Sequence, residues 1–159
     1  SYSVSSNDKI IKKLLCNIDC WKQNDLQFCK RICEVELLKP GWNFIGFVQG
    51  TGSFYKVASK KFPYIKVWTK IIYSEKGRQF YREYFEYLEE GKDKKIDNVV
   101  ILWEFNCLKK EVRILAAAFY ASDGSVIDSF IIPKFLMDWI LVFPESIGEF
   151  LLEKTCQKK

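Results

Sequence analysis

The chain has 159 residues, of which 48% are hydrophobic and 16% aromatic, so it is long enough and apolar enough to bury a core within one domain. Its longest apolar stretches are short and interrupted by charges, so we expect no membrane-spanning segment. The net charge is +5, but the 25 basic and 20 acidic residues are mixed along the chain, which argues against nucleic-acid binding. Histidine is absent, which excludes Ser-His-Asp and Cys-His catalysis and histidine ligands for a metal.

Four of the six cysteines lie in the N-terminal quarter, spaced as C-x3-C-x8-C-x3-C. They fall in two segments with helical periodicity, residues 7–21 and 24–36. Because cysteines four residues apart share one helix face, two antiparallel helices would place Cys16 opposite Cys33 and Cys20 opposite Cys29. The spacing therefore predicts a helical hairpin over residues 1–39, stapled by the disulfides Cys16–Cys33 and Cys20–Cys29.

Two other roles compete for these four cysteines. Four thiolates can hold zinc, although structural zinc sites prefer C-x2-C or C-x4-C spacing in tight turns. A redox-active pair is more typical of C-x-x-C at the start of a helix. The even number and symmetric spacing favour disulfides in an oxidising compartment, so we predict no metal and no cofactor. Thiol-dependent redox or metal chemistry at the C-x3-C pairs remains the alternative function.

Residues 40–159 predict an antiparallel sheet with helices, which makes the fold class α+β. Pro40-Gly41 separates this unit from the hairpin, although the two parts can form one compact body. The alternation of apolar and polar residues predicts strands, and Ser74 and Gly91 mark the two ends of a helix. In chain order, the first elements that we expect are strands over 42–49, 54–58 and 65–73, followed by a helix over 75–90 and an exposed loop over 92–97.

Three further strands, joined by tight turns, predict an antiparallel meander over 99–107, 112–121 and 126–132. Alternation along the first of them places Trp103 and Cys107 on the core-facing side. Ser146 and Glu149 form a capping box, so a final helix is expected to extend to about Cys156. A disulfide between Cys107 and Cys156 would fasten that helix to the core face of the sheet.

Several short sequence features follow one another in a characteristic order between residues 42 and 156. They are Ile65–Lys70, Trp103–Cys107, Tyr120–Gly124, Trp139, Pro144–Glu149 and Cys156. In this order the chain resembles the surface-adhesin protein E-like family of exported bacterial proteins. The resemblance implies a sheet covered by a helix, a Cys107–Cys156 disulfide, and a periplasmic, outer-membrane-associated or secreted protein. We expect a removed signal sequence, because the chain begins with Ser1 and its single methionine is Met137.

The best-known member of that family is an outer-membrane lipoprotein that binds host extracellular-matrix and serum proteins. The resemblance brings no catalytic or cofactor site. The four-cysteine hairpin and the long aromatic helix depart from the family pattern, so no adhesive residue is carried over to this chain.

Three side chains are candidates for a ligand-binding site. Glu104 lies on the non-core face, and if the hairpin covers that face the carboxylate is buried and needs a partner such as Arg113. Tyr87 lies outside the aromatic face of its helix and is the better candidate for an exposed contact. That face, which we expect to pack on the sheet or the hairpin, consists of Phe80, Tyr81, Tyr84 and Phe85.

These observations together predict a non-enzymatic domain that is exported or belongs to the cell envelope. Without histidine and with paired cysteines, the chain offers no obvious nucleophile and base, so no catalytic residue is proposed. The abundance of aromatic residues favours binding of a protein partner, whose identity the sequence does not give.

Overall fold

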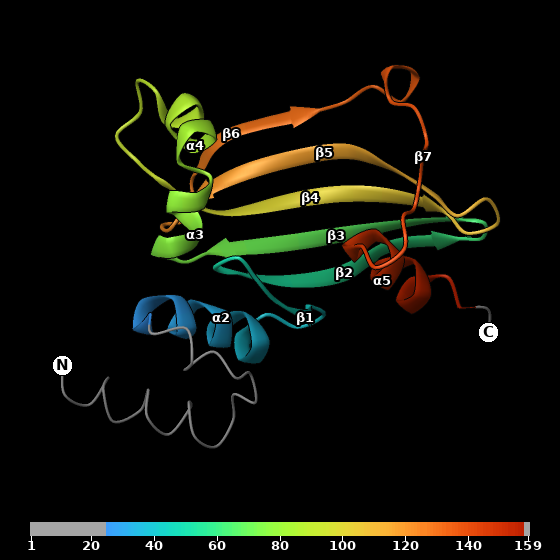
Figure 1. Cartoon of the computed structure of the whole chain (residues 1–159), viewed down its shortest axis with the longest axis horizontal. Coiled ribbons are helices and arrows are strands. Elements are labelled where there is room, and N and C mark those ends of the chain that lie inside the picture. The colour runs from blue at the N-terminus through green and yellow to red at the C-terminus, as the bar shows by residue number, and fades with distance from the viewer. Residues whose placement is uncertain (1–24, 158–159) are drawn as a thin grey trace.

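The computed structural model describes residues 25–157, which form one antiparallel sheet with helices packed on it (Figure 1). The strands are β1 (Asn43–Val48), β2 (Thr51–Lys61), β3 (Tyr64–Tyr73), β4 (Ile96–Asn106), β5 (Glu111–Ala121), β6 (Val126–Ile131) and β7 (Ile140–Leu141). The helices are α2 (Leu26–Leu38), α3 (Glu75–Phe80), α4 (Arg82–Glu89), the 3-10 turn η3 (Lys134–Leu136) and α5 (Ile147–Thr155). The predicted α+β class is therefore confirmed for the described part of the chain.

The sheet is a meander in which β1 to β6 lie side by side in chain order, while β7 pairs with β5. Every neighbouring pair is antiparallel. Short turns impose this direction on all consecutive pairs except β3 and β4, which are connected through α3 and α4. β2 is longer than the predicted strand over residues 54–58, because β3 pairs with it along its full length from Thr51 to Lys61.

One face of the sheet is covered by α4 and α5. In β3, Ile65 and Val67 point to this face and are fully buried, as expected for β-branched residues on the core side of a strand. β4 continues the same face, because Val67 lies opposite Trp103. The predicted orientation of Trp103 towards the final helix is thus confirmed, and its indole N–H donates to Thr69 Oγ1 at 2.7 Å.

The last helix, α5, begins where the capping box predicted. Ser146 Oγ accepts a hydrogen bond from Glu149 N at 3.1 Å. Leu151 is fully buried against Phe105 and the neighbouring aliphatic residues of β3. At its end, Cys156 is joined to Cys107 by a disulfide with a Cα–Cα distance of 5.6 Å, which is the pairing that the family resemblance implied.

The helix predicted over residues 75–90 is in fact two helices, α3 and α4, with a break at Tyr81. The Tyr81 ring packs edge-on against Tyr73, and α4 then directs Phe85 and Leu88 into the core beside β3 and β4. Helical periodicity did not reveal the break, because the position of α4 depends on this tertiary packing. The prediction that the whole aromatic face is packed was wrong, since Phe80 is 62% exposed and Tyr84 is 50% exposed.

The loop predicted over residues 92–97 is also shorter than expected. Ile96 is 1% exposed and begins β4. Its N–H donates to Glu89 Oε2 at 2.6 Å, and its carbonyl accepts from Arg78. Asp97 forms an ion pair with Arg31 of α2. These partners come from three different helices, so the local charge pattern could not indicate that the segment is ordered.

The N-terminal part of the described chain is α2, whose N-cap Asp25 accepts a hydrogen bond from Phe28 N at 3.0 Å. Phe28 and Ile32 are fully buried against Phe54 of β2 and Ile72 of β3. Helix α2 therefore packs on the face of the sheet opposite α5, near the β2–β3 end. The alternation of the strands supports this assignment, since Ile72 and Ile71 point to opposite faces.

Cys29 and Cys33 of α2 are both disulfide-bonded and almost fully buried. The predicted pairings Cys16–Cys33 and Cys20–Cys29 include residues outside the described range. They stay predictions, as do the first helix of the hairpin and the division of the chain into residues 1–39 and 40–159.

Candidate functional site

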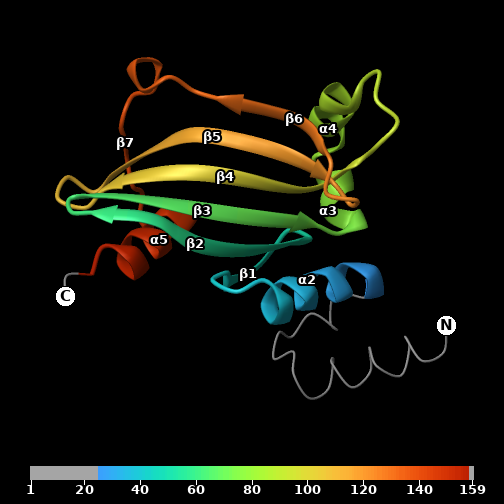
Figure 2. The same ribbon diagram turned by 180° about the vertical axis from the view of Figure 1, so that it is seen from behind.

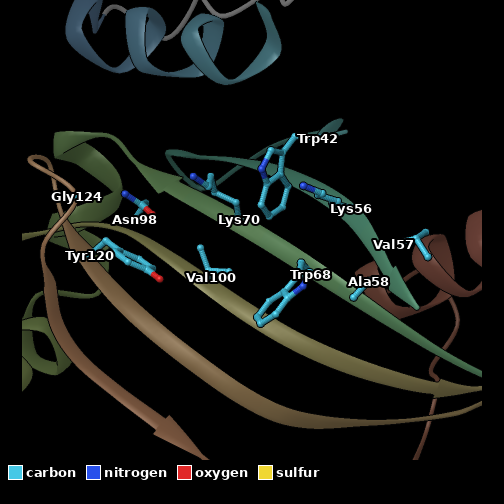
Figure 3. Close-up of a pocket in the computed structure, with 10 residues that line it drawn as sticks. All are labelled: Trp42, Lys56, Val57, Ala58, Trp68, Lys70, Asn98, Val100, Tyr120 and Gly124. Carbon is cyan, nitrogen blue, oxygen red and sulfur yellow. The ribbon is translucent and has the colours of Figure 1, made fainter. Parts of the chain in front are cut away.

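The face of the sheet opposite α4 and α5 carries a groove of about 640 Å³. In the view of Figure 2 no described helix lies in front of the middle of β2 to β5. The described residues that line the groove are Trp42, Lys56, Val57, Ala58, Trp68, Lys70, Asn98, Val100, Tyr120 and Gly124 (Figure 3).

Strand register brings these side chains together from four strands. Lys56 of β2 lies opposite Trp68 of β3, and Lys70 lies opposite Val100 of β4. Asn98 in turn lies opposite Tyr120 of β5. Residues that are directly opposite in an antiparallel pair point to the same face, so the rows combine into one surface. A register shift in β2 after Val57 accounts for Val57 and Ala58 both lining the groove.

Trp42 forms one wall of the groove and lies between two lysines (Figure 3). Lys70 Nζ is 5.4 Å and Lys56 Nζ is 6.0 Å from the indole centroid, within the range of cation–π contacts. Gly41, at a φ of +89°, turns the chain ahead of Trp42 in a conformation that favours glycine. The indole thus places two ammonium groups at one side of the groove.

The electrostatic character of the groove is positive. Its described lining includes two lysines and no carboxylate. Partial burial lowers the pKa of Lys70, and the neighbouring Lys39 lowers it further. Both effects act against the charged form of this ammonium group.

The predicted partners Glu104 and Arg113 are brought together by the structure. Glu104 is 4% exposed, and its Oε1 accepts from Arg113 Nε at 2.8 Å and from Nη2 at 2.6 Å. The guanidinium lies 4.2 Å from the ring of Trp139, and Lys134 Nζ is 4.0 Å from the second carboxylate oxygen.

Trp139 and Lys134 lie over this pair, while α2, the described helix of the predicted hairpin, packs near the other end of the strands. The segment around β7 crosses the end of β5, which strand alternation alone did not indicate. With its carboxylate bound by arginine, Glu104 is a cross-strand ion pair beside the groove and does not line it. Any role of Glu104 or Arg113 in ligand binding stays a prediction.

Tyr87, the third predicted candidate, is 74% exposed on α4. It lies on a helix that covers the opposite face, so the structure does not bring it together with the groove or with Glu104. Its role as a contact residue remains a prediction.

The groove residues were missed by reasoning from the sequence. A usable signal was present in β3, where Trp68 stands between Lys66 and Lys70 on the side that alternation assigns to the non-core face. Large aromatic residues on such a face are candidates for contacts with a partner. Trp42 had no comparable signal, because it precedes β1 and reaches the groove only through the fold.

Within residues 25–157, no group of three or more acidic or cysteine side chains is arranged to hold a metal ion. In the same range, no helix has the length and apolar character needed to cross a membrane.

Comparison with known proteins identifies the family. A search of curated proteins found no match, and a search of solved structures found none either. The family model for surface-adhesin protein E matches residues 54–157, which is more than half of the chain and extends from β2 through α5 and the Cys107–Cys156 disulfide. The chain belongs to the surface-adhesin protein E family.

Proposed function

We propose that this chain is a non-enzymatic, exported binding domain that holds a segment of a partner protein in the groove on its open sheet face. The observation that carries the proposal is a groove of about 640 Å³ that contains two tryptophans and two lysines on the face that α4 and α5 leave uncovered. Tryptophan is enriched where protein interfaces gain most of their binding energy, which supports a protein as the partner. Membership of a family named for a surface adhesin supports the same role.

Several observations favour binding over catalysis. The chain has no histidine, and the described groove lining has no carboxylate or cysteine that could act as a base or nucleophile. Glu104, the most buried carboxylate near the groove, is bound by Arg113 through two hydrogen bonds. The Glu104 carboxylate is therefore engaged in a cross-strand ion pair.

The state of the cysteines supports a location of the protein in an oxidising compartment and a structural role for its disulfides. Cys29, Cys33, Cys107 and Cys156 are all disulfide-bonded. Such bonds persist outside the cytosol, as expected for a protein in the periplasm, at the outer membrane or in the medium. Because Cys29 and Cys33 are buried, they are less accessible to thiol exchange than a redox-active pair would be, and we favour the staple over thiol chemistry.

The test is to immobilise the full chain and to capture proteins from envelope and extracellular fractions. Captured proteins are identified, purified and titrated calorimetrically against the wild-type chain, Trp68→Ala and Tyr87→Ala. We expect Trp68→Ala to weaken binding by about tenfold or more, because the central aromatic of the groove is lost. Tyr87→Ala, on the opposite side, is expected to bind as the wild type does.

The converse result, with loss of binding only in Tyr87→Ala, would move the binding surface to α4. Turnover of any captured partner by the wild-type chain would contradict the non-enzymatic role.

A further inference from the structure

The composition of the groove indicates what kind of segment it accepts. We propose that the groove binds an acidic segment of a partner protein, in which an aromatic or aliphatic side chain stands beside carboxylates. This inference rests on the function proposed above and adds the chemistry of the partner.

The first requirement for the partner is negative charge. Lys56 and Lys70 lie on either side of Trp42, and within residues 25–157 neither lysine takes part in an ion pair. Two arginines near this face differ, since Arg113 is bound to Glu104 and Arg31 to Asp97. Two ammonium groups at one side of a groove, for which the described part of the chain supplies no ion-pair partner, are complementary to one or two carboxylates.

The surroundings of Lys70 strengthen this requirement. Its ammonium group is partly desolvated and lies near Lys39, and both effects lower its pKa. A carboxylate placed between Lys70 and Lys56 would supply negative charge in a site that is partly shielded from water. Hydrogen bonds between charged groups are stronger than neutral ones under these conditions.

The second requirement is an apolar side chain. Beyond the lysines, Trp68, Val57 and Val100 are apolar lining residues of the groove. The backbone groups of Trp68 and Val100 are paired in the β2–β3 and β3–β4 ladders, so their main-chain donors are already used. Binding energy at this part of the groove therefore has to come from contact between apolar surfaces.

The same composition argues for a peptide over an anionic sugar chain. A sugar presents hydroxyl groups along its whole length, and each buried hydroxyl needs a hydrogen-bond partner. Apart from the lysines and tryptophans, the described lining offers one amide, on Asn98, and one phenol, on Tyr120. The Asn98 amide already donates to Asp97 Oδ2 at 3.0 Å. A peptide segment that combines carboxylates with an aromatic or aliphatic side chain matches the two lysines and the apolar lining of the groove better than a sugar does.

The test is a selection from random linear peptides displayed on phage, with the full chain as bait and Trp68→Ala for counter-selection. Enriched peptides are synthesised and titrated calorimetrically at low and high salt. We expect enrichment of acidic sequences that contain an aromatic or large aliphatic residue, and affinity that falls as salt rises. Lys70→Gln should weaken binding by about tenfold. Lys66→Gln is the matched control, since Lys66 shares strand and face with Lys70 but does not line the groove.

Each other outcome has a defined meaning. Enrichment of neutral or basic peptides whose binding depends on Trp68 would overturn the acidic segment and leave the proposed function intact. Absence of any peptide whose binding depends on Trp68 would count against the proposed function itself. A heparin-derived sulfated oligosaccharide titrated in parallel is expected to bind more weakly than the selected peptides. Tighter binding of the oligosaccharide, lost in Lys70→Gln, would assign the lysines to a sugar and overturn the peptide class.

Discussion

The two faces of the sheet are built from the same strands but differ in character. On β3, Ile65 and Val67 are fully buried beneath α5, while Trp68 and Lys70 stay partly exposed on the other side. The covered face consists of aliphatic and aromatic residues in two core clusters beneath α4 and α5. The open face carries lysines and tryptophans, with α2 near one end and Trp139 at the other.

This difference teaches how one sheet can separate stability from binding. In a strand, successive side chains point to opposite faces, so neighbouring residues contribute to different surfaces. Substitutions on the covered face should therefore alter the free energy of unfolding, whereas substitutions in the groove of the open face should alter binding.

The largest expected effect on stability comes from replacing, one at a time, two tryptophans that lie on opposite faces of adjacent strands. Trp103 packs against the α5 cluster and donates to Thr69, so Trp103→Ala should lower the free energy of unfolding by about 3–5 kcal/mol. Trp68→Ala, on the open face, should cost under about 1.5 kcal/mol. Urea denaturation of both variants measures the contrast. Equal losses would show that the open face is part of the folding core.

Removal of the disulfide on the covered face is expected to have the next largest effect. Cys107 and Cys156 are 49 residues apart in sequence, and their bond restricts the unfolded chain. Cys107→Ser combined with Cys156→Ser should therefore lower the free energy of unfolding by about 2–4 kcal/mol. Peptide binding in the groove should be unchanged at temperatures where the variant is folded. Loss of binding by the folded variant would show that the two faces are coupled.

Substitutions in the Glu104–Arg113 pair test whether the end of the open face away from α2 contributes to the free energy of unfolding. Glu104→Gln leaves a nearly buried guanidinium without its anion and should cost about 2–3 kcal/mol. Arg113→Met in the same chain should recover much of that loss, because the unpaired charge is then removed. Lys134→Ala is the control, expected within about 0.5 kcal/mol since Lys134 is largely exposed. Denaturation of the single and double variants measures the coupling, and additive losses would contradict an ion pair.

The smallest expected effect on stability is at Lys70. Because its pKa is lower in the folded chain than its ordinary value of 10.5, the charged group opposes folding at neutral pH. Lys70→Met should raise the free energy of unfolding by under about 1 kcal/mol at neutral pH. The gain relative to the wild type should shrink as the pH rises through the lowered pKa towards 10.5, above which the lysine is neutral in both states. Thermal unfolding of the two chains across pH measures it, and a loss of stability at neutral pH would make Lys70 a structural residue.

Much of the sheet could be predicted from local patterns. Alternation along residues 65–73 and 99–107 indicated strands and assigned Trp103 to the core face, because the side-chain period of a strand is two. Ser146 marked the start of α5 for an equally local reason, since its hydroxyl binds a backbone N–H of its own first turn. The Glu104–Arg113 pairing also followed from neighbouring strands, as the two residues are directly opposite.

The candidate groove, by contrast, could not be assembled from the sequence. Its walls come from β2, β3, β4, β5 and the residue before β1, and no local pattern states how strands are ordered across a sheet. The break at Tyr81 and the burial of Ile96 were missed for the same reason, because both depend on partners from other elements.

The sequence by itself determined where β1 to β6 lie, the antiparallel pairing of strands joined by tight turns, the starts of α3 and α5, and the face on which residues such as Trp103 lie. All of these follow from interactions within a few residues along the chain or from a period of two. Only the tertiary structure decided that α4 and α5 share one face, that Trp139 closes the far end of the other, and that Trp42 stands between Lys56 and Lys70. Those arrangements depend on long-range packing, in which each element lies where it buries the most apolar surface against the others.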